Sequence, residues 1–328
     1  MKILYAIQGT GNGHLTRALD IIPALQKHGE LDLLVSGCQV DLSLPYPMKY
    51  RLRGLSFIFG KNGGVDFYKT FAQVNSRSFF REMKMLQVQD YDLVISDFEP
   101  ISAWACTWAK KACIGLSNQV AVLSPYVPQP AENDMLGKLI LRNYAPTTAH
   151  YGLHFARFHD SIYTPIIRKE IRELQVSNQG HYTVYLPAHE DYKIVNRLTQ
   201  LKQVEWQVFS KHNKQAFRLG NVWVRPVQQD AFLESMAASA GVLCAAGFGT
   251  PSEVLYLQKK LLVIPMKNQF EQVCNAAVLQ HMGVSTLKNL KKKQLPALHQ
   301  WVAEGPTVKV NYPDETAALV QRIVQENT

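Results

Sequence analysis

Residues 242–276 read VLCAAGFGTPSEVLYLQKKLLVIPMKNQFEQVCNA, and this stretch decides the fold of the chain. It holds two apolar runs, at 242–246 and 261–265, and each run passes through a polar turn into a predicted helix. The first turn is Gly247-Phe248-Gly249, after which Thr250 and Pro251 can cap and open a helix. Strand, loop and helix in immediate repetition predict an α/β domain with both loops at one edge of a sheet.

The first turn is suited to an anion. A helix that starts after a glycine turn presents free backbone N–H groups and the positive end of its dipole, so a diphosphate fits there. Glu253 follows the cap closely, and its carboxylate could accept two hydrogen bonds from a ribose diol. However, a glycine turn is common in any α/β domain, and Glu253 could be an ordinary acid of the first helical turn. The residues alone leave both interpretations open.

The whole motif resembles the donor-site signature of the GT-B glycosyltransferases. The resemblance is carried by Gly247, Thr250, Ser252 and Glu253, followed by EQ at 271–272 and NA at 275–276. The pattern is most similar to that of the UDP-glucuronosyltransferases, the plant secondary-metabolite glycosyltransferases and the lipid-linked N-acetylglucosaminyltransferase of peptidoglycan synthesis. It implies two doubly wound parallel-sheet domains of the Rossmann-like type that face each other across a cleft.

The resemblance also implies roles for single residues. Glu253 would hold the ribose, Thr250 would meet phosphate, and Glu271 with Gln272 would hold sugar hydroxyls. Arg225 would take the place of the usual aromatic residue beside the nucleotide base. The complete implied donor site is Gly247, Phe248, Gly249, Thr250, Ser252, Glu253, Arg225, Gln228, Glu271 and Gln272. One departure is Ala245, because the family often has a His or Arg there that reaches the phosphate.

A second glycine-rich loop follows the first apolar run, at residues 8–14 (QGTGNGH). Gly9 and Gly11 match the dinucleotide-binding fingerprint, but its third glycine position holds His14, and the next strand lacks the acidic residue that would hold a ribose. A dinucleotide cofactor is therefore not expected. The loop instead resembles the GT-B acceptor loop, in which Gly11, Asn12 and Gly13 lie under the acceptor. His14 would be the general base, unless it only caps the following helix.

Asp97 follows the predicted strand at 93–96, at the edge of the sheet where ligands bind. In the families named above, an aspartate at this place pairs with the base histidine, although Asp97 could also cap the next helix. The D-x-D at residues 90–92 precedes the strand, so we expect no metal site there. A further strand is predicted over 114–122, and Asn118 and Gln119 within it are candidate acceptor contacts.

Length and composition predict two domains. With 328 residues, 47% of them hydrophobic, the chain can bury two cores of ordinary size. We place an acceptor-side domain at 1–162 and a nucleotide-sugar-binding domain at 163–328, and the resemblance implies that a last helix over 313–325 crosses back to the first domain. The chain begins with a strand and has no apolar run of about 20 residues, so we expect a cytoplasmic protein, with peripheral contact at the inner face of the membrane.

Positive charge is concentrated in residues 49–84, where eight basic residues face two acidic ones and aromatic residues are interleaved. This pattern suits an anionic membrane surface, an acidic acceptor or single-stranded nucleic acid, and it also suits a solvated helix over core aromatics. We favour contact with an acceptor or a membrane surface and expect no nucleic acid.

Together these features predict an inverting, metal-independent transferase. It would move a sugar from a nucleoside-diphosphate sugar, with UDP as the favoured carrier and no further cofactor, to an acceptor hydroxyl that could be lipid-linked. Two alternatives stay open: a UDP-sugar epimerase or hydrolase of the same fold, and a non-catalytic protein that binds anionic lipid or nucleic acid.

Overall fold

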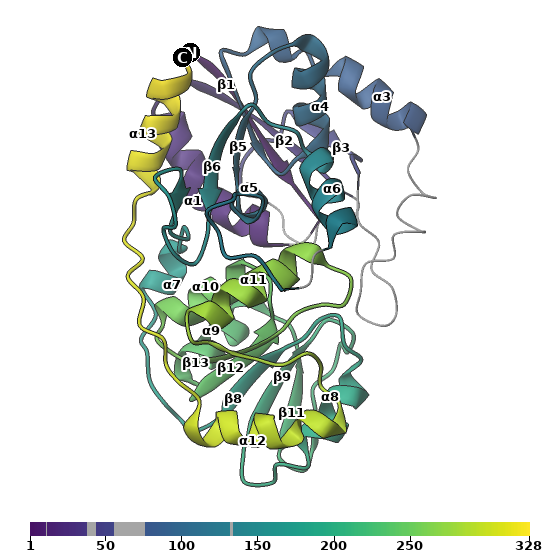
Figure 1. Ribbon diagram of the computed structural model, residues 1–328, viewed down its shortest axis with the longest axis vertical. Coiled ribbons are helices and arrows are strands. Elements are labelled where there is room, and N and C mark those ends of the chain that lie inside the picture. Colours follow the sequence, from purple (N-terminus) through teal and green to yellow (C-terminus); the bar gives the residue numbers. More distant parts are fainter. Residues whose placement is uncertain (11, 38–43, 56–75, 132–133) are drawn as a thin grey trace.

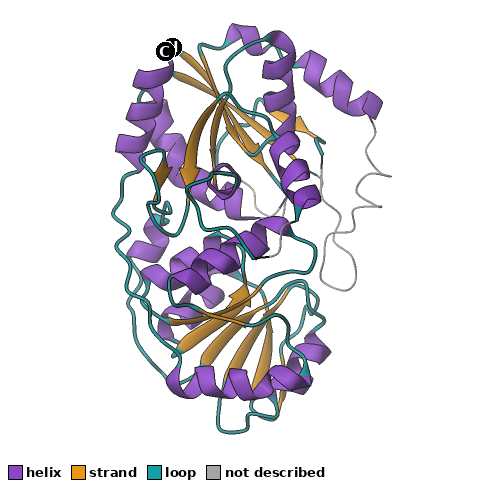
Figure 2. Cartoon of the chain, viewed as in Figure 1, coloured by secondary structure: helices purple, strands orange, loops and turns teal. Residues whose placement is uncertain are grey.

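The computed structural model describes residues 1–10, 12–37, 44–55, 76–131 and 134–328. It contains two seven-stranded sheets, formed by successive halves of the chain (Figure 1). Helices cover both faces of each sheet (Figure 2). This is the predicted arrangement of two doubly wound α/β domains.

The first sheet has the strand order β3-β2-β1-β4-β5-β6-β7, and every pairing in it is parallel. Its strands are β1 (Lys2–Gln8), β2 (Glu30–Ser36), β3 (Tyr50–Leu52), β4 (Leu93–Asp97), β5 (Ile114–Ser117), β6 (Ala149–Leu153) and β7 (Ile162–Tyr163). The helices of this half are α1 (Asn12–Gln26), α3 (Ser76–Met85), α4 (Pro100–Ala109), α5 (Asn118–Val122) and α6 (Met135–Tyr144), with a 3-10 turn η1 (Val88–Asp90). The predicted domain boundary at 162/163 falls inside β7, and the division into domains stays a prediction.

The second sheet has the order β10-β11-β9-β8-β12-β13-β14 and is parallel except for β10, which pairs antiparallel with β11. Its strands are β8 (Tyr182–Tyr185), β9 (Trp206–Ser210), β10 (Phe217–Leu219), β11 (Val222–Pro226), β12 (Gly241–Ala245), β13 (Lys260–Ile264) and β14 (Ser285–Thr286). The helices are α7 (Lys169–Arg172), α8 (Asp191–Leu198), α9 (Gln229–Ala238), α10 (Gly249–Tyr256), α11 (Phe270–His281), α12 (Leu295–Glu304) and α13 (Thr316–Asn327), with a 3-10 turn η2 (Lys292–Gln294).

The two halves are packed together. Helices α10 and α11 lie between the sheets, and the chain returns from α12, at the far end of the second half, to α13 beside α1 (Figure 1). Leu319, Val320 and Ile323 of α13 are buried in the same apolar cluster as the core of the first sheet. At the centre of the molecule, Phe155 after β6 meets Phe248 before α10 with ring centroids 5.3 Å apart. The ends of strands from both sheets therefore meet in one region.

The predicted strand over 114–122 is wrong in its second half. Only Ile114–Ser117 is a strand, and α5 follows it directly. Ser117 caps α5, because its Oγ accepts a hydrogen bond from Val120 N at 3.3 Å. Of the basic, aromatic-containing segment 49–84, residues 56–75 lie outside the described part of the chain, and the described residues contribute β3 and most of α3.

Candidate active site

The first half of the site lies where β1 and β4 end. The two strands are neighbours and Ile7 is in register with Asp97, so the start of α1 and the last residue of β4 lie at the same edge. His14, in the first turn of α1, places its Nδ1 2.8 Å from Oδ1 of Asp97. The contact that the resemblance implied is therefore present, although the catalytic role of each residue stays a prediction.

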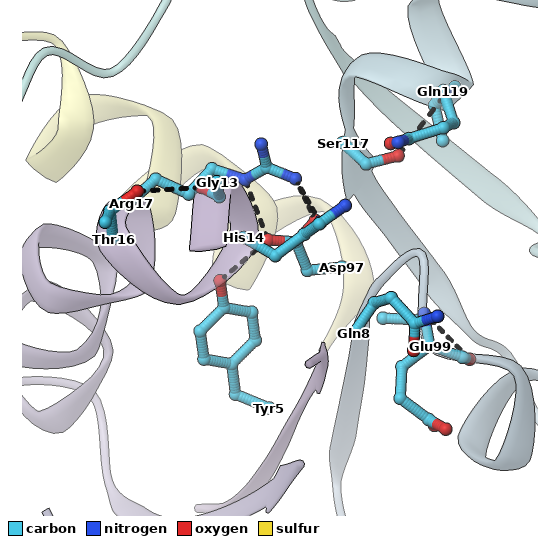
Figure 3. Close-up of polar contacts among 12 residues, drawn as sticks. Tyr5, Gln8, Gly13, His14, Thr16, Arg17, Asp97, Glu99, Ser117 and Gln119 are labelled. Carbon is cyan, nitrogen blue, oxygen red and sulfur yellow. Dashed lines mark hydrogen bonds and ion pairs between the residues drawn. The ribbon is translucent and has the colours of Figure 1, made fainter. Parts of the chain in front are cut away.

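Arg17 completes this group, although it is not among the site residues predicted from the sequence. It is buried, it donates from Nε to Oδ2 of Asp97 at 2.8 Å, and its Nη2 donates to Oδ1 (Figure 3). The same Nη2 lies 2.6 Å from Nδ1 of His14. Its position one turn after His14, on the same helix face, was the available signal.

Asp97 stays ionised although no part of it is exposed. Burial acts to raise the pKa of its carboxyl, but the charge of Arg17 and then the contact with His14 outweigh burial and lower the pKa. The hydroxyl of Tyr5 donates weakly to Oδ2 at 3.4 Å. His14 Nδ1 can donate to Asp97 or accept from Arg17, and only the first arrangement leaves Nε2 free to take a proton.

The structure decides against two simpler interpretations of these residues. Helix α4 is capped by Glu99, whose carboxylate accepts hydrogen bonds from Ile101 N at 2.8 Å and Ser102 N at 2.6 Å, so Asp97 is not its cap. His14 does not only cap α1, because it lies inside the helix and its imidazole contacts Asp97 at the end of the neighbouring strand β4. Of the neighbouring loop residues, Gly11 lies outside the described residues, Asn12 begins α1, and Gly13 follows it.

The second half of the site is the turn between β12 and α10. Helix α10 begins at Gly249 with Phe248 as N-cap and without a side-chain capping bond, so the predicted cap at Thr250 is wrong. The physical reason is that Gly249 already adopts the helical conformation, which moves Thr250 inside the first turn. Neither Gly247 nor Gly249 has a positive φ, and a Cβ atom at either would meet no other atom within 4 Å. The glycines therefore leave open space beside an uncapped helix start.

Two predicted donor residues of α10 make contacts within the protein. Ser252 Oγ donates to the carbonyl of Phe248 at 2.7 Å. Glu253 is buried, and its Oε1 accepts from both Nε and Nη2 of Arg168, each at 2.8 Å. Burial raises the pKa of Glu253, while Arg168 acts in the opposite direction. Arg168 precedes α7 in the connection between the two sheets, and no sequence pattern indicated it.

Helix α11 brings Glu271 to the first half of the site. Its Oε2 accepts from Nε2 of Gln119, on α5, at 2.9 Å, which joins the two domains directly. Burial raises the pKa of Glu271, and His14 is the largest of the opposing influences, so the carboxylate and the imidazole lie within electrostatic reach. Gln272 uses its Oε1 to accept from Met266 N at 2.9 Å.

Amide side chains line this junction of α5 and α11, and several of their buried atoms have no partner among the described residues. They are Oδ1 of Asn118, Oε1 of Gln119, and both polar atoms of Asn275. Asn118 donates from Nδ2 to the carbonyl of Leu153 at 3.0 Å. Buried amides are normally hydrogen-bonded, so the hydrogen-bonding capacity of these atoms is unused within the described residues.

The residues predicted to hold the nucleotide base lie at the end of β11. The guanidinium of Arg225 stacks 4.3 Å from the ring centroid of Trp223 and 5.2 Å from that of Phe209. Its Nη1 donates to Gln207 at 3.3 Å. Gln228 is the N-cap residue of α9 and makes no side-chain capping bond. No pattern in the sequence indicated that Trp223 contacts Arg225.

Comparison with solved structures shows the same architecture over the whole chain. MurG of Acinetobacter baumannii is 15% identical, covers 99% of this chain and 99% of its own, and superposes with a TM-score of 0.59. The structure titled LpCGTa in complex with UDP is 14% identical, with 100% and 95% covered and a TM-score of 0.58. Spinosyn rhamnosyltransferase SpnG with thymidine diphosphate is 12% identical, with 99% and 96% covered and a TM-score of 0.56. The fold is therefore GT-B.

Sequence comparison assigns the family. A search of curated protein sequences gave no significant match. In contrast, residues 1–306 match the family described as Glycosyl transferase family 1, which is nearly the full length of the chain. The chain therefore belongs to glycosyl transferase family 1 and is a glycosyltransferase of the GT-B fold.

Proposed function

We propose that the protein transfers a sugar, with inversion at the anomeric carbon, from a nucleoside-diphosphate sugar to an acceptor hydroxyl. The observation that carries the proposal is the pairing of His14 with buried Asp97 on the first domain, together with the hydrogen bond from Gln119 of that domain to Glu271 of the second. The acceptor would bind on the side of α1 and α5, and the donor on the side of α10 and α11.

In the proposed reaction, His14 acts at Nε2. The acceptor oxygen attacks the anomeric carbon and forms the new glycosidic bond while its proton passes to Nε2. The bond from the anomeric carbon to the diphosphate oxygen breaks, and the leaving diphosphate carries away the electron pair. The uncapped start of α10 supports the negative charge that develops on that oxygen, because its N–H groups and helix dipole favour an anion.

The sugar and ribose contacts in this proposal come from the second domain. Glu271, Gln272 and the amide cluster of α5 and α11 would hold sugar hydroxyls, and Glu253 would hold the ribose. Glu253 is already joined to Arg168, so the ribose would share or replace that contact. Several structurally similar proteins were solved with thymidine diphosphate and one with UDP, which supports a nucleoside-diphosphate donor but leaves the base open.

The proposal needs no metal ion at the diphosphate. Asp92, the second acid of the D-x-D sequence, accepts from the backbone N of Lys2 at 2.6 Å, at the amino end of β1 and β4. That edge is opposite to the one that holds His14 and Asp97. Turnover that persists unchanged in the presence of a strong chelator is the expected result.

Replacing Gly249 by alanine should separate donor binding from folding. The new Cβ would meet no protein atom, and alanine in a helical conformation stabilises by about 0.4–1 kcal/mol, so the variant should fold well. The methyl group would, however, occupy space beside the diphosphate, and losing one hydrogen bond to a charged group weakens binding about 10–100-fold. The measurement is the thermal shift across a panel of UDP-, dTDP- and GDP-sugars, which raise apparent stability when they bind.

The matched control is Gly152→Ala, on β6. There the Cβ would lie 2.8 Å from the Cβ of Ala121, so this variant should lose stability. A Gly249→Ala protein that responds to the nucleotide sugar as the wild type does would show that the diphosphate does not lie at this turn. Absence of any response to the panel by the wild type would contradict nucleotide-sugar binding itself.

The alternatives share the donor site and differ in their products. An epimerase or a hydrolase consumes the nucleotide sugar without an acceptor, and gives an isomeric nucleotide sugar or a free sugar, respectively. We favour transfer because an imidazole paired with a carboxylate is suited to take the proton of an acceptor alcohol.

For the acceptor side, we propose contact with an anionic membrane surface, which would suit a lipid-linked acceptor. Helix α3 exposes Phe80 and Met85, 49% and 66% accessible, beside Arg81 and Lys84. Apolar side chains next to basic ones favour an anionic interface. No helix of the described residues is long and apolar enough to cross a membrane. The protein should sediment with phosphatidylserine vesicles at low salt, and failure to do so would contradict this contact.

A further inference from the structure

Arg17 joins the two residues to which the base function has been given. It reaches Asp97 with two hydrogen bonds, from Nε to Oδ2 and from Nη2 to Oδ1, in the bidentate geometry that is strongest for this pair. Nη2 of Arg17 and Nδ1 of His14 both contact Oδ1 of Asp97, and these two nitrogen atoms lie 2.6 Å apart (Figure 3). The proposed proton transfer does not use this guanidinium, although its Nη2 contacts the imidazole directly.

The charge of Asp97 poses a problem for a base at His14. A buried carboxylate favours a positive charge beside it, because water does not screen the carboxylate. An imidazole next to Asp97 would therefore tend to take up a second proton and become that charge. A doubly protonated imidazole cannot accept the proton of an alcohol. Burial acts to lower the pKa of the Arg17 guanidinium, but the negative charge of Asp97 outweighs burial and raises it. Arg17 is therefore a permanent cation.

We propose that Arg17 is a positioning residue that neutralises Asp97 and thereby keeps His14 singly protonated and able to accept a proton at Nε2. Two features of the geometry support this. The counter-charge of Asp97 is supplied by Arg17, so His14 can remain oriented by the carboxylate without becoming charged. A charged imidazole would also lie 2.6 Å from a guanidinium nitrogen, and like charges at this distance repel strongly.

The other groups around the imidazole do not replace Arg17. Among the described residues, Glu271 of α11 is a second acid within electrostatic reach, and it would favour a proton on His14. Tyr5 of β1 contacts Asp97 and not the imidazole, and the Phe98 ring lies parallel to it at 6.4 Å. Without Arg17, two carboxylates would therefore face His14, and within the described part of the chain no recorded side-chain contact would bring another cation to the imidazole. The inference rests on the proposed function, in which His14 is the base.

The test is the pH dependence of single-turnover rate at saturating donor. In Arg17→Gln we expect the acidic limb of the profile to move to higher pH by about one to three units, the range that one adjacent charge produces. Turnover near neutral pH should fall at least tenfold and recover as the pH rises. Arg17→Lys, which keeps the charge, should keep the acidic limb in place. Arg218→Gln, an exposed arginine on β10, is the matched control and should match the wild type.

A double variant guards against loss of folding. Arg17→Gln combined with Asp97→Asn removes both buried charges, so its acidic limb should return to the wild-type position while the rate stays low. The inference would be overturned if the acidic limb of the Arg17→Gln profile stayed in its wild-type position. It would also be overturned if the acidic limb of the double variant were displaced to higher pH. If His14→Ala abolishes turnover while Arg17→Gln leaves the limb in place, this inference alone is wrong. If His14→Ala leaves turnover unchanged, the proposed base fails and the inference fails with it.

Discussion

Replacing His14 by alanine is expected to lower kcat by about 10²–10⁴-fold, because a positioned general base contributes that much to proton transfer. His14 is the only histidine of the described chain that the structure brings to Asp97, at 2.8 Å. The donor would bind on α10 and α11, so the thermal shift caused by the nucleotide sugar should be unchanged. Steady-state turnover at saturating donor and acceptor is the measurement.

The control for His14 is His299→Ala on α12, an exposed histidine far from the site. It should keep full activity. A His14→Ala enzyme with wild-type kcat would mean that another group takes the proton. A variant that loses donor binding together with turnover would mean that His14 acts on the donor side instead.

Replacing Asp97 by asparagine should reduce both stability and turnover. Asp97 is completely buried and receives two hydrogen bonds from Arg17, so the change leaves a buried guanidinium without a counter-charge. Breaking one partner of such a pair costs about 3–5 kcal/mol. Loss of the orienting carboxylate in histidine-based sites lowers kcat by about 10⁴-fold, and we expect an effect of about 10³–10⁴-fold here.

The two effects of Asp97→Asn are measured separately. Urea unfolding monitored by fluorescence gives the loss of stability, and turnover of the folded variant gives the catalytic effect. Asp230→Asn, an exposed acid in the first turn of α9, should change neither by much. Wild-type stability in Asp97→Asn would show that the charge of Arg17 is satisfied elsewhere, and the account of this buried pair would be wrong.

Much of the fold could be predicted from the sequence because its buried parallel strands are continuous apolar runs. The run at 242–246 becomes β12, Gly241–Ala245, and that at 261–265 becomes β13, Lys260–Ile264, each displaced by one residue. The error over 114–122 has a local cause. The residues after Ser117 read NQVAV, whose valines favour a strand, but the cap at Ser117 and packing of α5 on β6 make them helical.

The site was predictable where neighbours in the sheet bring residues together, and not where distant segments meet. Asp97 could be placed at the ligand-binding edge because ligands bind at the carboxyl ends of parallel strands, and the resemblance to GT-B enzymes implied its pairing with His14. Arg168 could not be placed against Glu253, since it comes from the connection between the domains and no local pattern marks it. The bond from Gln119 to Glu271 likewise depends on how the two domains pack.

The central claim is that the two domains together perform a single direct displacement at the anomeric carbon. The most direct test is proton NMR of the glycoside formed from a nucleotide sugar of known anomeric configuration, with methanol as a surrogate acceptor. The account predicts a methyl glycoside of inverted configuration, formed by the wild type and not by His14→Ala. A product with the configuration of the donor would contradict it, because a single attack assisted by His14 cannot give retention.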